Sequence, residues 1–148
     1  MSFEEIDRRA TPMGEISLRR RLEPSLHVDV YEVKLGEEFL MSSLFTVGET
    51  ALATLGLAEV LAANLDVLVG GLGLGYTARA VLQDSRVRSL HVVETSGAVI
   101  EWFEKDLLPL ATPLTADPRC HLVEADFFGI VAGDSSIGPH APGLWHAV

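Results

Sequence analysis

The sequence of 148 residues is poor in cysteine, in lysine and in long apolar runs. Cys120 is the only cysteine, so no disulfide can form within the chain. Because Cys120 stands in an apolar stretch, we expect a packed side chain rather than a nucleophile. Only two lysines are present and the net charge is −10, which argues against binding to nucleic acid or to an anionic membrane. Polar residues interrupt the most apolar stretch, residues 52–65, so no transmembrane helix is predicted.

Targeting and metal signals are also absent. The chain begins Met1-Ser2-Phe3-Glu4-Glu5, without the basic start of a secretion signal, and we therefore expect a cytoplasmic protein. The five histidines are scattered without ligand spacing, which predicts no metal site. What the chain does have is a composition that is 48% hydrophobic, enough for one ordinary core. Its acidity suits a polycationic partner such as a polyamine, although acidic surfaces also serve solubility.

Two regions differ in their hydrophobic pattern. Residues 1–46 alternate between apolar and polar side chains, which predicts a β-hairpin appendage. Within it Arg19-Arg20-Arg21 is interpreted as a solvated strand edge, with an anion site as the alternative. Residues 47–148 predict a Rossmann-like α/β domain with a parallel sheet covered on both faces.

The expected elements of this second region alternate along the chain. They are a helix over 49–65, a strand over 67–69, a helix over 77–83, a strand over 89–94, a helix over 98–107 and a strand over 121–124. The helix over 98–107 contains Trp102 and Phe103, which are candidates for stacking on a nucleobase. Their helical spacing favours core packing instead.

A glycine-rich turn follows the first strand of the predicted sheet. Gly71, Gly73 and Gly75 let the backbone turn sharply and approach a ligand closely. The next strand ends at Glu94, at the distance where a carboxylate grips a ribose diol. The glycines are spaced G-x-G-x-G, whereas dinucleotide-binding folds use G-x-G-x-x-G. The pattern therefore favours the class I S-adenosylmethionine fold, with an NAD-type site as the alternative.

Three blocks of the sequence resemble the spermidine synthase family. Residues 67–82 align without a gap to V-L-I-I-G-G-G-D-G-G-x-x-R-E-V-L, Val93-Glu94 matches the end of the family's second strand, and residues 117–126 resemble D-P-R-V-x-L-V-x-x-D. The resemblance implies a class I methyltransferase fold and aminopropyl transfer in polyamine biosynthesis, with S-adenosylmethionine or its decarboxylated form as cofactor. It implies that Glu94 holds the ribose hydroxyls and Asp126 the adenine amine.

The sequence also departs from this family. Leu74 stands where the family has an aspartate that holds the aminopropyl amine, and a leucine cannot pair with an ammonium. The family's catalytic strand would begin at residues 145–148, so its aspartate would lie beyond Val148. In the N-terminal part only Glu49 matches a family position that orients the polyamine. We therefore expect nucleoside binding without aminopropyl transfer to putrescine, and Glu49 is the single candidate for a catalytic residue.

Three functions remain open. The first is a spermidine synthase-like transferase, and the second is a methyltransferase of the same fold, which Leu74 favours. The third is a non-catalytic nucleoside-binding or assembly module, favoured by the apparent truncation before the catalytic strand. A sheet truncated there is expected to leave residues 122–123 partly uncovered. A homodimer paired through the N-terminal hairpins is therefore also expected.

Overall fold

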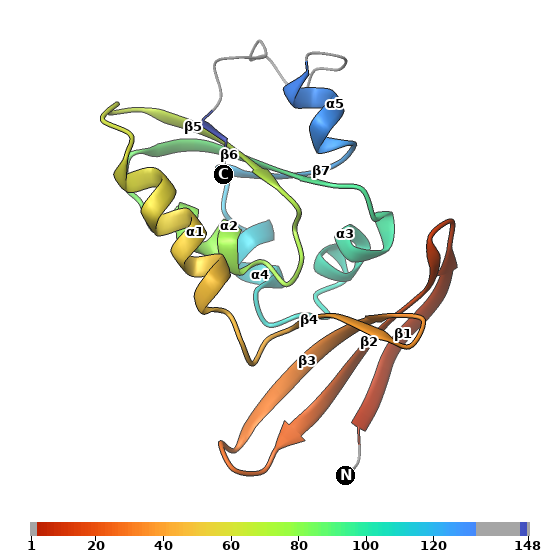
Figure 1. The fold of residues 1–148 in the computed structure, drawn as a ribbon. Helices are drawn as coiled ribbons and strands as arrows, with labels where there is room; N and C mark the ends of the chain where they lie inside the picture. The colour runs from red at the N-terminus through yellow and green to blue at the C-terminus, as the bar shows by residue number, and fades with distance from the viewer. Residues whose placement is uncertain (1–2, 133–145, 148) are drawn as a thin grey trace. The chain divides into compact units, whose positions relative to one another are not determined.

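The structure, a computed structural model, describes residues 3–132, 146 and 147 (Figure 1). The chain divides into two compact units, Met1–Thr46 and Val47–Val148. No helix in the described part of the chain is long and apolar enough to cross a membrane.

The first unit is a four-stranded antiparallel sheet. Its strands β1 (Phe3–Thr11), β2 (Gly14–Glu23), β3 (Val28–Leu35) and β4 (Glu38–Ser42) pair in chain order. Ile16 and Leu18 of β2 are buried, and Leu18 lies directly opposite the buried Val33 of β3. Apolar and polar residues alternate along these strands, and successive side chains of a strand point to opposite sides of the sheet. The apolar residues therefore gather on one buried face.

The three consecutive arginines lie in β2, which is an interior strand of this sheet. The Nε atoms of Arg19 and Arg21 lie 3.1 and 3.0 Å from the same carboxylate oxygen of Glu32. The guanidinium of Arg19 also lies 4.8 Å from the ring centroids of Phe3 and Phe39. The expectation of a solvated edge is therefore wrong, because a buried carboxylate and two aromatic rings accommodate the arginines inside the sheet.

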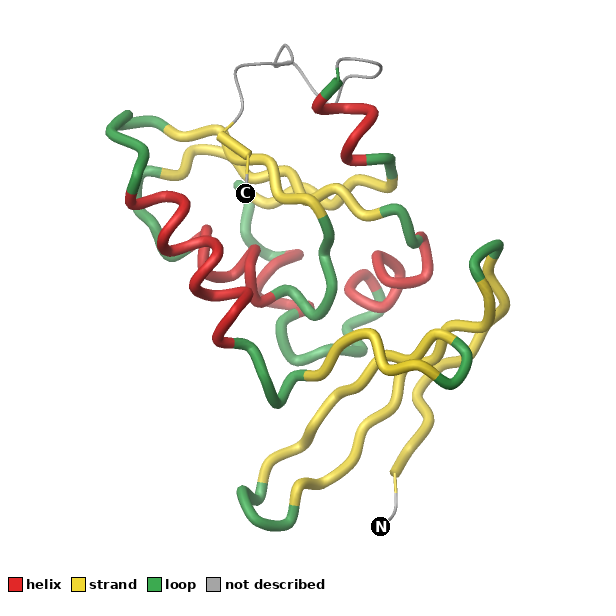
Figure 2. The backbone as a smooth tube through the Cα atoms, viewed as in Figure 1, coloured by secondary structure: helices red, strands yellow, loops and turns green. Residues whose placement is uncertain are grey.

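The second unit alternates strands and helices, as predicted. Its elements are α1 (Val47–Ala58), β5 (Leu65–Gly70), α2 (Tyr76–Leu82), β6 (Val87–Glu94), α3 (Gly97–Glu104), α4 (Ala111–Thr115), β7 (Cys120–Glu124), α5 (Phe127–Val131) and β8 (His146–Ala147). The sheet order is β7-β6-β5-β8, and all its pairs are parallel. Figure 2 shows α5 on one face of this sheet and the other helices on the opposite face. The predicted fold class is confirmed.

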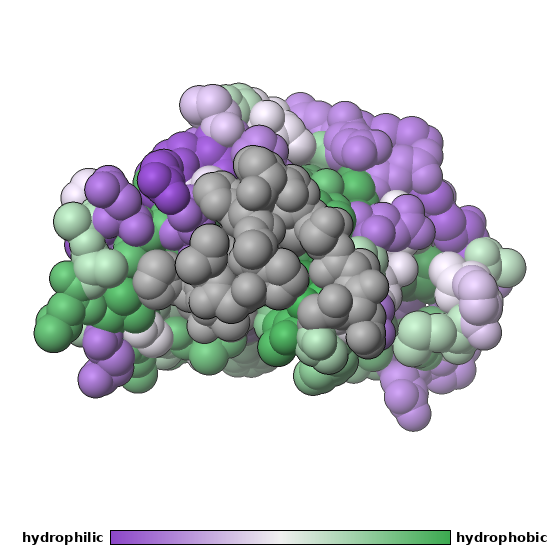
Figure 3. Space-filling view, turned by 90° about the horizontal axis from the view of Figure 1, so that it is seen from above, coloured by the Kyte–Doolittle hydropathy of each residue, from purple (hydrophilic) through white to green (hydrophobic). Residues whose placement is uncertain are grey.

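Helix α1 is shorter than the sequence predicted, because it ends at Ala58 instead of continuing to residue 65. Arg86 donates to the carbonyl oxygens of Leu57 and Val60, and so satisfies groups that a longer helix would bond internally. In the segment that follows, residues 60–63 are apolar. Figure 3 shows apolar residues gathered near the left end of the face viewed there, beside hydrophilic ones. Leu61 in this segment is 97% exposed.

Strand β8 pairs with β5, since His146 and Ala147 lie beside Val67 and Leu68. Among the described strands, β7 therefore lies at one end of the sheet, next to β6. Residues 122–123 of β7 are half-buried, as expected for a strand with a neighbour on one side.

Candidate functional site

The sequence-predicted ligand residues meet at one edge of the parallel sheet. Parallel strands place their carboxyl ends together, and such an edge is where open α/β sheets bind ligands. Strand β5 ends at Gly70, beside Val93, and the last residues of β6 and β7, Glu94 and Glu124, lie opposite each other. At this edge, the glycine turn follows β5 and Glu94 ends β6. The segment that contains Asp126 follows β7 at the same edge.

The glycines of the turn have different roles although all three adopt a positive φ. Gly71, Gly73 and Gly75 have φ values of 96°, 54° and 93°, a region that favours glycine. A Cβ at Gly75 would lie 2.8 Å from the Leu114 side chain and 3.1 Å from the ring of Phe103. A Cβ at Gly71 would meet no atom within 4 Å. Gly75 therefore packs against the core, while Gly71 faces open space.

Glu94 connects this turn to the next helix. One carboxylate oxygen accepts a hydrogen bond from the Leu72 amide at 3.0 Å, and the other accepts from the Ser96 amide at 3.0 Å. Ser96 in turn is the N-cap residue of α3. Each carboxylate oxygen can accept more than one hydrogen bond. Glu94 can therefore hold the turn and still accept from ligand hydroxyls.

Asp126 is exposed and is the N-cap of α5. Its Oδ1 accepts a hydrogen bond from the amide of Phe128 at 3.1 Å. This helix start was not predicted from the sequence. The signal was present, because an aspartate before a short apolar run is a common helix start. In the described part of the chain, the other carboxylate oxygen of Asp126, Oδ2, accepts no hydrogen bond.

Glu49 lies beside the N-terminus of α2. Its backbone carbonyl accepts a hydrogen bond from the hydroxyl of Thr77 at 3.1 Å. Burial raises the pKa of the neighbouring Tyr76, Arg79 opposes this shift, and the charge of Glu49 adds to it. The structure thus brings the exposed Glu49 close to the helix that follows the glycine turn.

Several other candidates belong to the core. Leu72 and Leu74 of the turn are only 4% and 7% exposed. Trp102 and Phe103 are fully buried, in agreement with core packing rather than nucleobase stacking. Burial also raises the pKa of the Cys120 thiol to about 12, which leaves it protonated and unreactive at neutral pH.

Charge is distributed unevenly between the two ends of these strands. Near the amino ends, Arg86, Arg88 and Arg119 bond to Asp84, Asp66 and Asp117. The carboxyl ends present carboxylates, Glu94, Glu124 and Asp126, and in the described residues no lysine or arginine follows β5, β6 or β7 directly. These carboxylates therefore give a negative charge to the edge of the sheet that carries the glycine turn.

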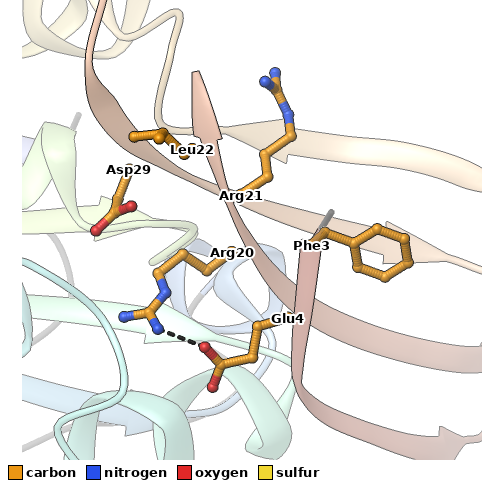
Figure 4. A pocket seen from close by; sticks show the side chains of 6 residues that line it. All are labelled: Phe3, Glu4, Arg20, Arg21, Leu22 and Asp29. Atoms are coloured by element: carbon orange, nitrogen blue, oxygen red, sulfur yellow. Dashed lines mark hydrogen bonds and ion pairs between the residues drawn. The ribbon is translucent and has the colours of Figure 1, made fainter. Parts of the chain in front are cut away.

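No group of three or more histidine, cysteine or acidic side chains is placed to hold a metal ion, as far as the described residues extend. The first unit contains a shallow pocket of about 250 Å³ (Figure 4). Its two guanidinium groups are already paired, Arg20 with Glu4 and Arg21 with Glu23 and Glu32. These pairs leave neither guanidinium of the pocket free for an anionic ligand.

Comparison with known proteins identifies the fold. No protein-family model matches the sequence, and no curated protein matches it either. The structure is similar to spermidine synthase from Thermotoga maritima, with a TM-score of 0.67 and 24% identity over 82% of this chain and 41% of that one. It is equally similar to a spermidine synthase in complex with the transition state analogue AdoDATO, with a TM-score of 0.66, 24% identity, and coverage of 82% and 39%.

This likeness defines the chain as an α/β protein with the spermidine synthase fold, and it confirms the resemblance seen in the sequence at the level of the fold. The chain spans about two fifths of the length of these two spermidine synthases.

Proposed function

We propose that the carboxyl edge of the parallel sheet binds S-adenosylmethionine or its decarboxylated form, as a spermidine synthase-like transferase does. One observation carries this proposal. The open position at Gly71, the carboxylate of Glu94 and the carboxylate of Asp126 all lie at the edge where this fold class binds ligands.

The charge at this edge favours a sulfonium nucleoside over NAD. A sulfonium is cationic, and the carboxylates of Glu94, Glu124 and Asp126 stabilise a cation. The pyrophosphate of NAD would instead bring two negative charges to this acidic edge. We therefore propose that NAD binds much more weakly than the sulfonium nucleosides.

Each proposed ligand contact suits the chemistry of the side chain. Glu94 accepts from the ribose hydroxyls and Asp126 from the exocyclic amine of adenine, since a carboxylate only accepts hydrogen bonds. Bound there, the cofactor supplies a carbon next to a sulfonium for displacement by an amine. The chain contributes mainly by positioning, and Glu49 is the candidate for holding the incoming amine of a polyamine. The AdoDATO complex of a similarly folded spermidine synthase supports a ligand of this class.

Methyl transfer is the second candidate, and the position of Leu74 favours it. Because Leu74 is buried in the core, the turn offers no carboxylate at this position to an aminopropyl ammonium. S-adenosylmethionine carries a carboxylate on the carbon that bears its ammonium, so this end of the methyl donor is zwitterionic and depends less on a carboxylate of the protein. The choice between the two reactions therefore depends on how the two forms of the cofactor compare in affinity.

Calorimetry of the purified chain tests these proposals. The ligands are S-adenosylmethionine, its decarboxylated form, methylthioadenosine and NAD. We expect the first three to bind at least tenfold more tightly than NAD. Tighter binding of S-adenosylmethionine than of the decarboxylated form would favour methyl transfer, and the reverse would favour aminopropyl transfer. Equal affinity for NAD and the sulfonium nucleosides would refute the assignment.

A further inference from the structure

A phenylalanine is exposed at the candidate site. Phe128 is 79% exposed, whereas Trp102 and Phe103, the aromatic residues singled out in the sequence, are buried. Covering this ring with the apolar face of a ligand would remove apolar surface from water, which is favourable. Phe128 lies two residues after Asp126, and its own amide is the group that the Asp126 carboxylate binds.

The neighbours of Phe128 connect it to the glycine turn. The ring of Phe127 packs against the backbone of Gly70, where an added Cβ would lie 2.9 Å from the ring. Phe127 belongs to the buried cluster formed by Leu68, Val93 and Ile130. The rings of Phe127 and Phe128 meet edge to face with centroids 5.7 Å apart. A fixed ring therefore stands between Gly70 and Phe128, and supports Phe128 at the same edge as the turn.

We propose that Phe128 stacks on the nucleobase of the bound nucleoside. This inference rests on the proposed function and adds a residue to its site. Asp126 supplies a hydrogen-bond acceptor for the edge of an adenine, and Phe128 supplies an apolar face to its π-surface. An aromatic ring that stacks on a base contributes substantially to binding, whatever the base.

Three variants of the full chain separate stacking from a structural effect. Phe128→Ala removes the ring, and Phe128→Tyr keeps it. Val131→Ala is the matched control, because Val131 is an exposed residue of the same helix at 56% exposure. For methylthioadenosine we expect Phe128→Ala to weaken binding about 5- to 100-fold, and the other two variants to change it less than about threefold.

A second readout does not depend on affinity. A methylthionucleoside carrying 2-aminopurine loses fluorescence when its base stacks on an aromatic ring. At saturation we expect strong quenching by the unchanged chain and by Phe128→Tyr, and much weaker quenching by Phe128→Ala. Binding with unchanged affinity and quenching in Phe128→Ala would overturn the stacking role while the proposed function stands. Absence of nucleoside binding by the unchanged chain would refute the proposed function, and the stacking role with it.

Discussion

Glu94 and Asp126 at the carboxyl edge combine structural hydrogen bonds with the ligand contacts proposed above. Glu94 accepts from the amides of Leu72 and Ser96, and Asp126 accepts from the amide of Phe128. Substitution of either residue therefore changes the local backbone as well as any ligand contact. Ligand titration measures the effect on binding, and thermal unfolding measures the effect on the fold.

Glu94→Ala is expected to weaken binding of methylthioadenosine by about 1 to 3 kcal/mol, because ribose hydroxyls and two backbone amides lose a charged acceptor. Calorimetry measures this loss. Glu124→Ala is the matched control, since Glu124 lies opposite Glu94 at the end of the neighbouring strand and its loss changes the net charge equally. If both variants lose the same affinity, a general electrostatic effect explains the result and Glu94 has no specific contact.

Asp126→Asn is expected to keep helix α5 and to lose affinity for adenine nucleosides. Asparagine caps a helix about as well as aspartate, so its oxygen can remain on the Phe128 amide. The side-chain NH₂ then presents a donor where the adenine amine needs an acceptor. Titration with methylthioadenosine measures the affinity, and thermal unfolding checks the fold. Unchanged affinity would leave Asp126 with the capping role alone.

At the scale of elements, two D-x-R segments join helices to strands in the second unit. Asp84-Ser85-Arg86 precedes β6, and Asp117-Pro118-Arg119 precedes β7. In each segment the aspartate holds the arginine, which also donates to backbone carbonyls: Arg86 to Leu57 and Val60, Arg119 to Leu82 and Val87. Both arginines thus bind carbonyls at the C-terminal end of a helix, where a positive charge is favourable.

Arg119→Ala is expected to lower the free energy of unfolding by about 1 to 3 kcal/mol, because the carbonyls of Leu82 and Val87 lose a charged donor. Urea denaturation, monitored by tryptophan fluorescence, measures this free energy of unfolding. The fluorescence reports on the second unit, because both tryptophans belong to residues 47–148. Lys105→Ala serves as the control, because its pair with Glu101 is a half-exposed surface pair expected to contribute under about 0.5 kcal/mol. Equal losses in the two variants would contradict a capping role for Arg119.

The same segments predict a dependence of stability on pH. Hydrogen bonding to Arg86 and Arg119 lowers the pKa of Asp84 and of Asp117. A lowered carboxyl pKa stabilises the fold above the unfolded pKa of about 3.9, and this stability is lost as the pH falls through the folded pKa. We therefore expect urea midpoints to fall below about pH 4. Asp117→Asn should flatten this decline, and an unchanged slope would contradict the contribution of Asp117.

On the scale of the whole molecule, the alternation of strands and helices and the existence of two regions could be predicted from the sequence, because hydrophobic period and glycine position are local signals. The place of Arg19 and Arg21 could not, since it depends on Glu32, which lies on another strand. The end of α1 could not be predicted from the sequence either, because Arg86, which binds the carbonyl of Val60, is 26 residues away along the chain. At the candidate site, the spacing of the sequence was enough to predict a role for Glu94, and this role stays a prediction, whereas the exposure of Phe128 is visible only in the folded chain.

The oligomeric state remains a prediction from the sequence. We expect a homodimer, and sedimentation equilibrium of the purified chain over a tenfold range of concentration measures it. A monomer at all concentrations would refute the expectation.

The hydrogen bonds of Glu94 have a kinetic consequence. They hold the Leu72 amide and the start of α3 in place before any nucleoside arrives. A ligand then meets a turn that is already formed, so little conformational entropy is lost when it binds. If the nucleoside binds as proposed, we expect its association to be limited by encounter rather than by loop closure, with an observed rate that rises in proportion to ligand concentration without reaching a plateau.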